Sequence, residues 1–135
     1  PDSMAASLET FGEVTASGRR WAILGDMLEL GHNTASCHQD LAPHVLALHD
    51  RGLLDHLLLV GTHMDNLVHA IADTPLRSKT TYLPEFEPTH AASIAAQFQS
   101  GDLVLIKGSR GLAMERIIES VVFQAERPEQ SMNQD

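Results

Sequence analysis

The chain has 135 residues, 43% of them hydrophobic, which is the size of one ordinary domain with a real core. Its 9 basic and 18 acidic residues give a formal net charge of −9, which repels nucleic acid and anionic membranes unless the few cations gather in one place. A single cysteine, Cys37, excludes an internal disulfide, and no apolar stretch approaches the roughly 20 residues of a membrane span. We therefore expect a cytoplasmic protein that binds no nucleic acid and inserts into no membrane.

The pattern of apolar residues predicts strands that alternate with helices. Short continuous apolar runs are typical of strands buried on both faces, while spacings of three and four residues indicate helices. Pro43 lies inside one helical stretch and implies a kink or two segments. In chain order the predicted elements are a helix over 1–12, a strand over 21–24, a helix over 34–52, a strand over 56–60, a helix over 64–71, a weaker strand over 80–83, a loop over 84–89, a helix over 90–99, a strand over 103–106 and a helix over 112–122. The stripe that the last helix should bury consists of Met114, Ile117, Ile118, Val121 and Val122.

This alternation predicts the fold class: a Rossmann-like α/β domain with an open, mostly parallel sheet and helices on both faces. We expect the domain to span residues 1–123 and the polar residues 124–135 to form a disordered tail. Ligands bind at the carboxyl ends of parallel strands, so the loops that begin at Gly25, Gly61 and Lys107 should line one edge of the sheet.

A basic turn, Lys107-Gly108-Ser109-Arg110-Gly111, lies between the last predicted strand and helix. A strand that feeds a helix through such a turn aims backbone N–H groups and the positive end of the helix dipole at one point, which suits a phosphate or a carboxylate. The alternative is a solvated turn that keeps an edge loop soluble. The sequence contains neither a Walker A loop nor a G-x-G-x-x-G fingerprint, so we do not expect a self-contained kinase or dehydrogenase.

Three carboxylates are further candidates. Asp26 and Glu29 follow the first predicted strand, where a carboxylate can take a ribose hydroxyl, a substrate ammonium or a magnesium-bound water. The structural alternative is an Asx-type turn at Asp26 and a capping contact at Glu29. Glu115 falls in the first turn of the last predicted helix, where a carboxylate complements the dipole without any ligand.

The histidines and the cysteine predict no site of their own. The chain has eight histidines, but they show no recurring ligand spacing, so we expect no metal site. Cys37 and His38 are neighbours, and adjacent residues on a helix point about 100° apart, so they form no catalytic dyad. We assign no catalytic residue to this chain.

Four motifs in register resemble the C-terminal domain of the Mur ligase family. They are Pro1-Asp2-Ser3-Met4 before a helix, the run from Leu24 to Gly31 after the first strand, Cys37-His38 in the next helix, and Lys107-Gly108-Ser109-Arg110 with Met114-Glu115. The resemblance extends to about Val122 and is closest to the members that add D-Ala-D-Ala in bacterial peptidoglycan synthesis. It implies a Rossmann-like module, in agreement with the fold class above.

The resemblance implies an ATP-dependent, Mg²⁺-assisted ligase. Such an enzyme transfers a phosphate from ATP to the carboxylate of UDP-N-acetylmuramoyl-tripeptide, which gives an acyl phosphate and ADP. The amine of D-Ala-D-Ala then attacks the acyl phosphate and releases phosphate. In the family a central domain binds the nucleotide and the metal, and an N-terminal domain holds the UDP sugar. Neither domain is in this sequence, nor is the family's nucleotide-touching segment before the Pro-Asp-Ser-Met motif. Because the chain starts at Pro1 without an initiator methionine or a signal peptide, we expect a piece of a longer polypeptide. Because those parts of the family are missing, we expect the isolated chain to be inactive, and we expect it to be a monomer.

The dipeptide offers a carboxylate and an amine, so its pocket needs cations or N–H donors at one end. Lys107, Ser109 and Arg110 are the residues that we expect to bind the dipeptide carboxylate, through charge-assisted hydrogen bonds. Alternatively, the Lys107 side chain contacts a phosphate group when the domains close.

The acidic residues are expected to play supporting roles. We expect Asp26 and Glu29 on the nucleotide side or at the domain hinge, and Glu115 beside Arg110, holding it in place. Two other functions stay open: a Mur or folylpolyglutamate-synthetase-type ligase with a different incoming amino acid, and a non-catalytic Rossmann-like module that binds a small anion.

Overall fold

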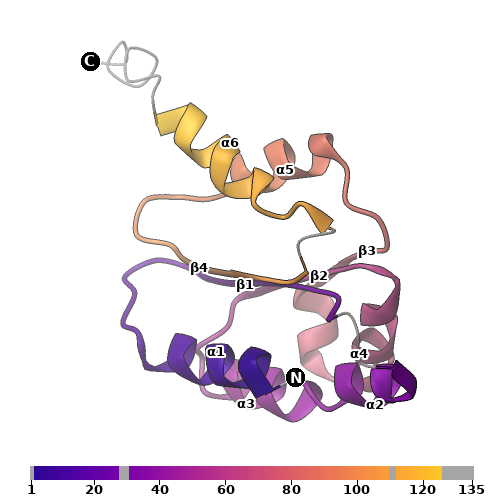
Figure 1. The fold of residues 1–135 in the computed structure, drawn as a ribbon. Helices are drawn as coiled ribbons and strands as arrows, with labels where there is room; N and C mark the ends of the chain where they lie inside the picture. Colours follow the sequence, from indigo (N-terminus) through magenta and orange to yellow (C-terminus); the bar gives the residue numbers. More distant parts are fainter. Residues whose placement is uncertain (1, 28–30, 110–111, 126–135) are drawn as a thin grey trace.

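The computed structural model describes residues 2–27, 31–109 and 112–125, and within them strands alternate with helices as predicted (Figure 1). The helices and strands are α1 (Asp2–Glu13), β1 (Arg20–Gly25), α2 (Thr34–Gln39), α3 (Ala42–Asp50), β2 (His56–Val60), α4 (Asp65–Ala70), β3 (Thr80–Leu83), α5 (Pro88–Ala95), β4 (Leu103–Lys107) and α6 (Arg116–Ala125). Short 3-10 turns cover Gly31–Asn33, Thr62–Met64 and Pro75–Lys79.

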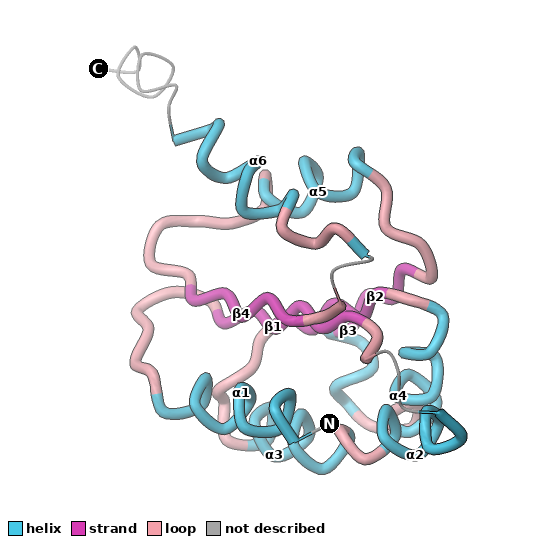
Figure 2. The backbone as a smooth tube through the Cα atoms, in the orientation of Figure 1, coloured by secondary structure: helices cyan, strands magenta, loops and turns pink. Residues whose placement is uncertain are grey.

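The four strands form one parallel sheet in the order β3-β2-β1-β4. Helices α1 to α4 cover one face of this sheet, and α5 and α6 cover the other (Figure 2). This is the predicted Rossmann-like α/β class. All six residues of β1 are buried, as expected for a strand covered on both faces, whereas every residue of β4, at the edge, is only half-buried.

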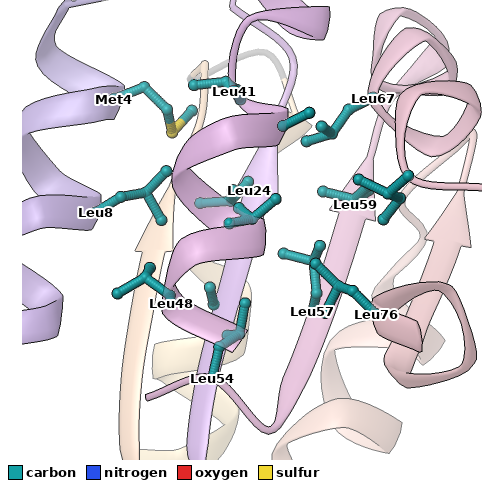
Figure 3. Close-up of a cluster of buried hydrophobic side chains, with 14 of the residues drawn as sticks. Met4, Leu8, Leu24, Leu41, Leu48, Leu54, Leu57, Leu59, Leu67 and Leu76 are labelled. Carbon is teal, nitrogen blue, oxygen red and sulfur yellow. The ribbon is translucent and has the colours of Figure 1, made fainter. Parts of the chain in front are cut away.

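The core consists of two apolar layers, because successive side chains of a strand point to opposite faces of the sheet. Leu24 and Leu59 point into the larger layer, which fills the space under α1 to α4 (Figure 3). The smaller layer, under α5 and α6, comprises Trp21, Ile23, Leu58, Val60, Ala91, Ile94, Met114 and Ile117. Both layers touch the central strands β1 and β2, so these strands fix the position of every helix.

Pro43 divides the second helical stretch into two helices, one of the two predicted outcomes. It is the second residue of α3, where a backbone N–H would have no partner within the helix. Asn33 stands at the N-cap of α2, but its side chain makes no capping hydrogen bond in the described structure.

The boundaries of α5 differ from the prediction. The helix begins at Pro88 rather than at residue 90, because Glu87 and His90 form a reciprocal capping box in which His90 Nδ1 accepts the Glu87 N–H at 3.0 Å. It ends at Ala95, four residues before the predicted end. The predicted loop over 84–89 is therefore two residues too long.

The start and the buried face of α6 also differ from the prediction. Ala113 has a φ of 54°, a left-handed conformation that a helix cannot include, so α6 begins at Arg116 instead of near residue 112. Of the predicted stripe, Met114 and Ile117 are buried, but Ile118 and Val121 are exposed. The apolar face of this helix is thus only partly covered in the described part of the chain.

Asp102, just before β4, connects the turn before β4 to β1. Its side chain is 3% exposed and accepts hydrogen bonds from the Arg19 N–H at 2.9 Å, the Trp21 indole N–H at 3.0 Å and the Gln99 N–H at 3.0 Å. Burial raises the pKa of the Asp102 carboxyl, but these hydrogen bonds and the nearby Arg19 guanidinium outweigh burial and hold the pKa below its ordinary value of 3.8.

Replacing Asp102 should therefore change how stability depends on acid. A carboxyl whose pKa is lowered by folding stabilises the folded state above its unfolded pKa of 3.8, and this contribution disappears as the pH falls through the folded-state pKa. In urea unfolding, we expect the stability gap between wild type and Asp102→Asn to be constant at neutral pH and to narrow below about pH 4. The exposed Asp73, changed to Asn, is the matched control and should show no such gap. A gap independent of pH would contradict the expectation.

Candidate functional site

The loops after β1, β2 and β4 meet at the carboxyl edge of the sheet, as predicted. The Asp26 N–H donates to the Val60 carbonyl at 3.0 Å, the Gly61 N–H donates to the Leu83 carbonyl at 2.8 Å, and the Ser109 N–H donates to the Asp26 carbonyl at 3.2 Å. These backbone hydrogen bonds fasten each loop to a neighbouring strand or loop, so the polar residues of the loops share one edge.

Two glycines allow the turn after β4 to lie directly on the end of β1. A Cβ on Gly108 would come within 2.8 Å of the Gly25 Cα, and a Cβ on Gly25 would collide with the side chains of Met114 and Leu112. The backbones therefore approach as closely as only glycine permits, and Met114 closes the space above them. The basic turn is consequently held against β1 rather than extended into solvent.

Lys107 and Ser109 both belong to this fastened turn. Lys107 is the last residue of β4, opposite Leu24 of β1, and is half-buried. The Ser109 Oγ is buried and has no hydrogen-bond partner among the described residues. Buried hydroxyls are nearly always paired, so an Oγ without a partner among these residues is an exception. Arg110 lies outside the described residues.

Asp26 has a structural role, the kind of role given as the alternative, but with partners other than those of an Asx turn. Its side-chain oxygens accept the backbone N–H groups of His63 at 3.1 Å and Met64 at 3.0 Å, and the residue is 4% exposed. The carboxylate therefore caps the 3-10 turn after β2, whereas the predicted alternative was an Asx turn within its own loop. Each oxygen already holds one hydrogen bond, and the expected role on the nucleotide side or at the hinge stays a prediction. Glu29 lies outside the described residues.

Glu115 lies directly before α6 rather than in its first turn. It is exposed, and its carbonyl accepts the Glu119 N–H at 3.2 Å. A carboxylate at this position still complements the positive end of the helix dipole. The expected contact with Arg110 falls outside the described residues and stays a prediction.

His38 has a structural role that the sequence analysis did not predict. It is fully buried, its Nε2 accepts the Met27 N–H at 3.0 Å, and its Nδ1 lies 2.6 Å from the Thr34 carbonyl, so the proton is on Nδ1. Both nitrogens are occupied by the backbone, which leaves neither for Cys37. His38 thus fixes the start of the loop after β1, and the signal for it in the sequence was its place in the Cys37-His38 motif.

Neither a metal-binding cluster nor a membrane-spanning helix is found among the described residues. In the described part of the chain, no group of three or more His, Cys, Asp or Glu side chains is arranged to hold a metal ion. The helices described there are all too short or too polar to cross a membrane.

A parallel sheet with a basic turn fastened at its carboxyl edge defines a Rossmann-like α/β domain with a candidate anion site. Residues 1–110 match the protein family described as "Mur ligase, glutamate ligase domain", and the chain belongs to this family.

Two curated relatives carry the same name. The UDP-N-acetylmuramoyl-tripeptide–D-alanyl-D-alanine ligase of Rickettsia prowazekii is 33% identical over 119 residues, and that of Treponema pallidum is 32% identical over 117 residues. These matches cover 88% and 87% of this chain but 24% of each relative, so the chain spans about a quarter of their length. Among solved structures, the MurF ligase of Thermotoga maritima in complex with ADP has the same fold, with a TM-score of 0.58 and 21% identity over 92% of this chain and 27% of that one.

Proposed function

We propose that this chain is the C-terminal domain of an ATP-dependent cytoplasmic ligase that adds D-Ala-D-Ala to UDP-N-acetylmuramoyl-tripeptide, and that the turn after β4 binds the incoming dipeptide. One observation at the site carries the second half of this proposal. The buried Ser109 Oγ, which lacks a partner among the described residues, follows Lys107 at the carboxyl edge of the sheet. The names of the two curated relatives support the first half.

Most of the chemistry belongs to parts of the protein outside this chain. ATP phosphorylates the tripeptide carboxylate, and the dipeptide amine then displaces phosphate to form the amide. The Thermotoga protein was crystallised with ADP, which supports nucleotide binding within the family. Asp26 is a poor candidate for Mg²⁺ because its oxygens accept backbone N–H groups. We therefore assign ATP and Mg²⁺ to the remainder of the full-length protein.

The contribution of this chain is to hold the dipeptide with its amine toward the acyl phosphate. A carboxylate in the turn would accept hydrogen bonds from the Ser109 hydroxyl and from the Lys107 and Arg110 cations. Since the Ser109 N–H donates to the Asp26 carbonyl and Gly108 lies directly against Gly25, the backbone at Gly108 and Ser109 is held in place before the ligand arrives. Such preorganisation lowers the entropic cost of binding, because these groups lose less conformational freedom when the ligand binds.

Replacing Lys107 or Arg110 by Ala in the full-length enzyme should raise the KM for D-Ala-D-Ala by about ten- to a hundredfold, the effect of losing one charge-assisted hydrogen bond. Ser109→Ala should raise it less, because a neutral donor is lost. The KM for ATP should stay within about twofold of the wild-type value. ADP release in the presence of the tripeptide substrate measures all three.

Lys79 provides the matched control. It is exposed and directly precedes β3, at the opposite end of the strands from the turn, so Lys79→Ala should leave both KM values unchanged. An unchanged dipeptide KM in Lys107→Ala and Arg110→Ala would refute the binding role of the turn. Because the family description names glutamate, D-Glu should be tested as the alternative amine, and turnover with D-Glu but not with D-Ala-D-Ala would refute the proposed reaction.

A further inference from the structure

Both ring nitrogens of His38 are hydrogen-bonded to the backbone. The residue is fully buried on α2, which packs against α4 on one face of the sheet (Figure 1). Its Nδ1 donates to the Thr34 carbonyl at 2.6 Å, one turn earlier in the same helix. Its Nε2 accepts the Met27 N–H at 3.0 Å. The first bond fixes the tautomer, and the second connects the helix to the loop after β1.

The peptide unit between Asp26 and Met27 is held from two sides. Its N–H belongs to Met27 and donates to His38, while its carbonyl belongs to Asp26 and accepts the Ser109 N–H at 3.2 Å. The described residues contain no cis peptide bond, and in a planar trans unit the N–H and the carbonyl point in opposite directions. One rigid group therefore joins His38 to the turn after β4.

The other polar groups of Asp26 are fixed as well. Its N–H donates to the Val60 carbonyl at 3.0 Å, and its carboxylate accepts the N–H groups of His63 at 3.1 Å and Met64 at 3.0 Å. The remaining freedom is rotation of the peptide unit that follows, about ψ of Asp26 and φ of Met27. Such a rotation breaks the bond to His38 and the bond to Ser109 together.

The bond to Ser109 depends on the bond to His38. At 3.2 Å it lies at the long end of the range of roughly 2.7 to 3.2 Å for an N–H donor and an oxygen acceptor. An amide whose N–H donates a hydrogen bond is a better acceptor at its carbonyl, because consecutive hydrogen bonds polarise one another. The His38 Nε2 thus both orients the Asp26 carbonyl and strengthens its weaker bond.

We propose that His38 is a positioning residue for the dipeptide site, a role that rests on the proposed function of the turn after β4. By holding the peptide unit between Asp26 and Met27, it keeps Ser109 and its neighbours where their donors meet the dipeptide carboxylate. His38 does not touch the dipeptide, since both of its nitrogens are used. Losing this contact weakens binding equally before and in the transition state, so it raises KM and leaves kcat unchanged.

Two variants of His38 isolate the bond to Met27. The Gln side chain reaches as far as Nε2, so His38→Gln can present an amide oxygen to the Met27 N–H. The Asn side chain reaches only the position of Nδ1, so His38→Asn can donate to the Thr34 carbonyl but leaves Met27 without an acceptor. Both variants lose the ring contact with His63, whose centroid lies 5.7 Å away. Their difference therefore reports the hydrogen bond rather than the packing.

In the full-length enzyme, His38→Asn should raise the KM for D-Ala-D-Ala about fivefold or more, with kcat and the KM for ATP within about twofold of wild type. His38→Gln should keep all three within about twofold. The matched control is His90→Ala. The His90 Nδ1 also accepts a backbone N–H at 3.0 Å, but on α5 and the other face of the sheet, so its loss should leave the three parameters unchanged.

Amide hydrogen exchange tests the connection independently of ligase activity. In the wild type, the Met27 and Ser109 amides should have protection factors within about tenfold of each other, because one rotation opens both. His38→Asn should lower both by about tenfold or more, and His38→Gln should lower neither. The wild-type comparison needs no variant, so it applies even if His38→Asn does not fold.

Three results would overturn the proposal. The first is a dipeptide KM that is unchanged in His38→Asn but raised in Lys107→Ala. The second is equal effects of His38→Asn and His38→Gln, which would assign the role to ring packing. The third is a wild-type Ser109 amide protected about a hundredfold less than that of Met27. If Lys107→Ala also leaves KM unchanged, the proposed function of the turn fails, and Ser109 protection that survives in His38→Asn refutes the role of His38 separately.

Discussion

Arg20→Met should lower the free energy of unfolding by about 3 kcal/mol, because three backbone carbonyls lose a charged donor, in one buried and two partly buried hydrogen bonds. Arg20 is 6% exposed and donates from Nε to the Leu53 carbonyl at 2.8 Å, from Nη1 to the Val14 carbonyl at 2.8 Å and from Nη2 to the Phe11 carbonyl at 2.7 Å. One guanidinium thus ties the end of α1 to the segment before β2. Urea unfolding at neutral pH measures the loss.

Two further variants separate charge from geometry. Arg20→Lys keeps the charge but reaches the carbonyls with one ammonium instead of a planar fork, so we expect a loss between wild type and Arg20→Met. Arg19→Met is the matched control: the Arg19 side chain is 37% exposed, and only its Nη2 donates, to the Gln97 carbonyl and the Asp102 carboxylate among the described residues, so we expect a smaller loss than for Arg20→Met. Equal losses for Arg19→Met and Arg20→Met would contradict the structural role of Arg20.

The strands were predictable because each is a continuous apolar run, but their places in the sheet were not. The β1 and β4 sequences are similarly apolar, yet β1 is fully buried and β4 is half-buried. Burial depends on the strand order, and that order results from pairing between segments about 80 residues apart. For the same reason, the sequence predicted a fully buried stripe on α6, where Ile118 and Val121 face an open edge.

The sequence predicted where in the fold the site lies, but not the hydrogen bonds that its residues make. Parallel strands place their carboxyl ends together, which sufficed to bring the loops of Asp26, Gly61 and Lys107 to one edge. The hydrogen-bond partners of Asp26 lie 37 and 38 residues further along the chain, beyond the reach of any local turn rule. The backbone contacts of His38 lie in the loop before α2 and in its own helix, and no ligand-like spacing reveals them.

Gly61→Ala should destabilise the protein by about 3 kcal/mol, through backbone strain and through loss of the Asp26 cap. Gly61 has φ 109° and ψ 156°, a region that residues with a side chain rarely adopt, and a Cβ there would collide with the Asp26 carboxylate. The carboxylate would have to leave the N–H groups of His63 and Met64. Gly52→Ala is the matched control, because Gly52 has φ 71° with nothing within 4 Å of a new Cβ, so only strain of about 1 kcal/mol remains.

A double-mutant cycle separates the collision from the strain at Gly61. Asp26→Ala removes the carboxylate and should itself destabilise the protein by about 2 kcal/mol, since the buried Met64 N–H and the partly buried His63 N–H lose their acceptor. In that background the new Cβ meets no carboxylate, so Gly61→Ala should add only its strain and the double variant should be more stable than the sum of the singles predicts. If Gly61→Ala has the same effect in both backgrounds, then Asp26 does not require glycine at position 61. An interaction free energy above about 1 kcal/mol would instead make Asp26 and Gly61 one structural unit that holds the loops after β1 and β2 together.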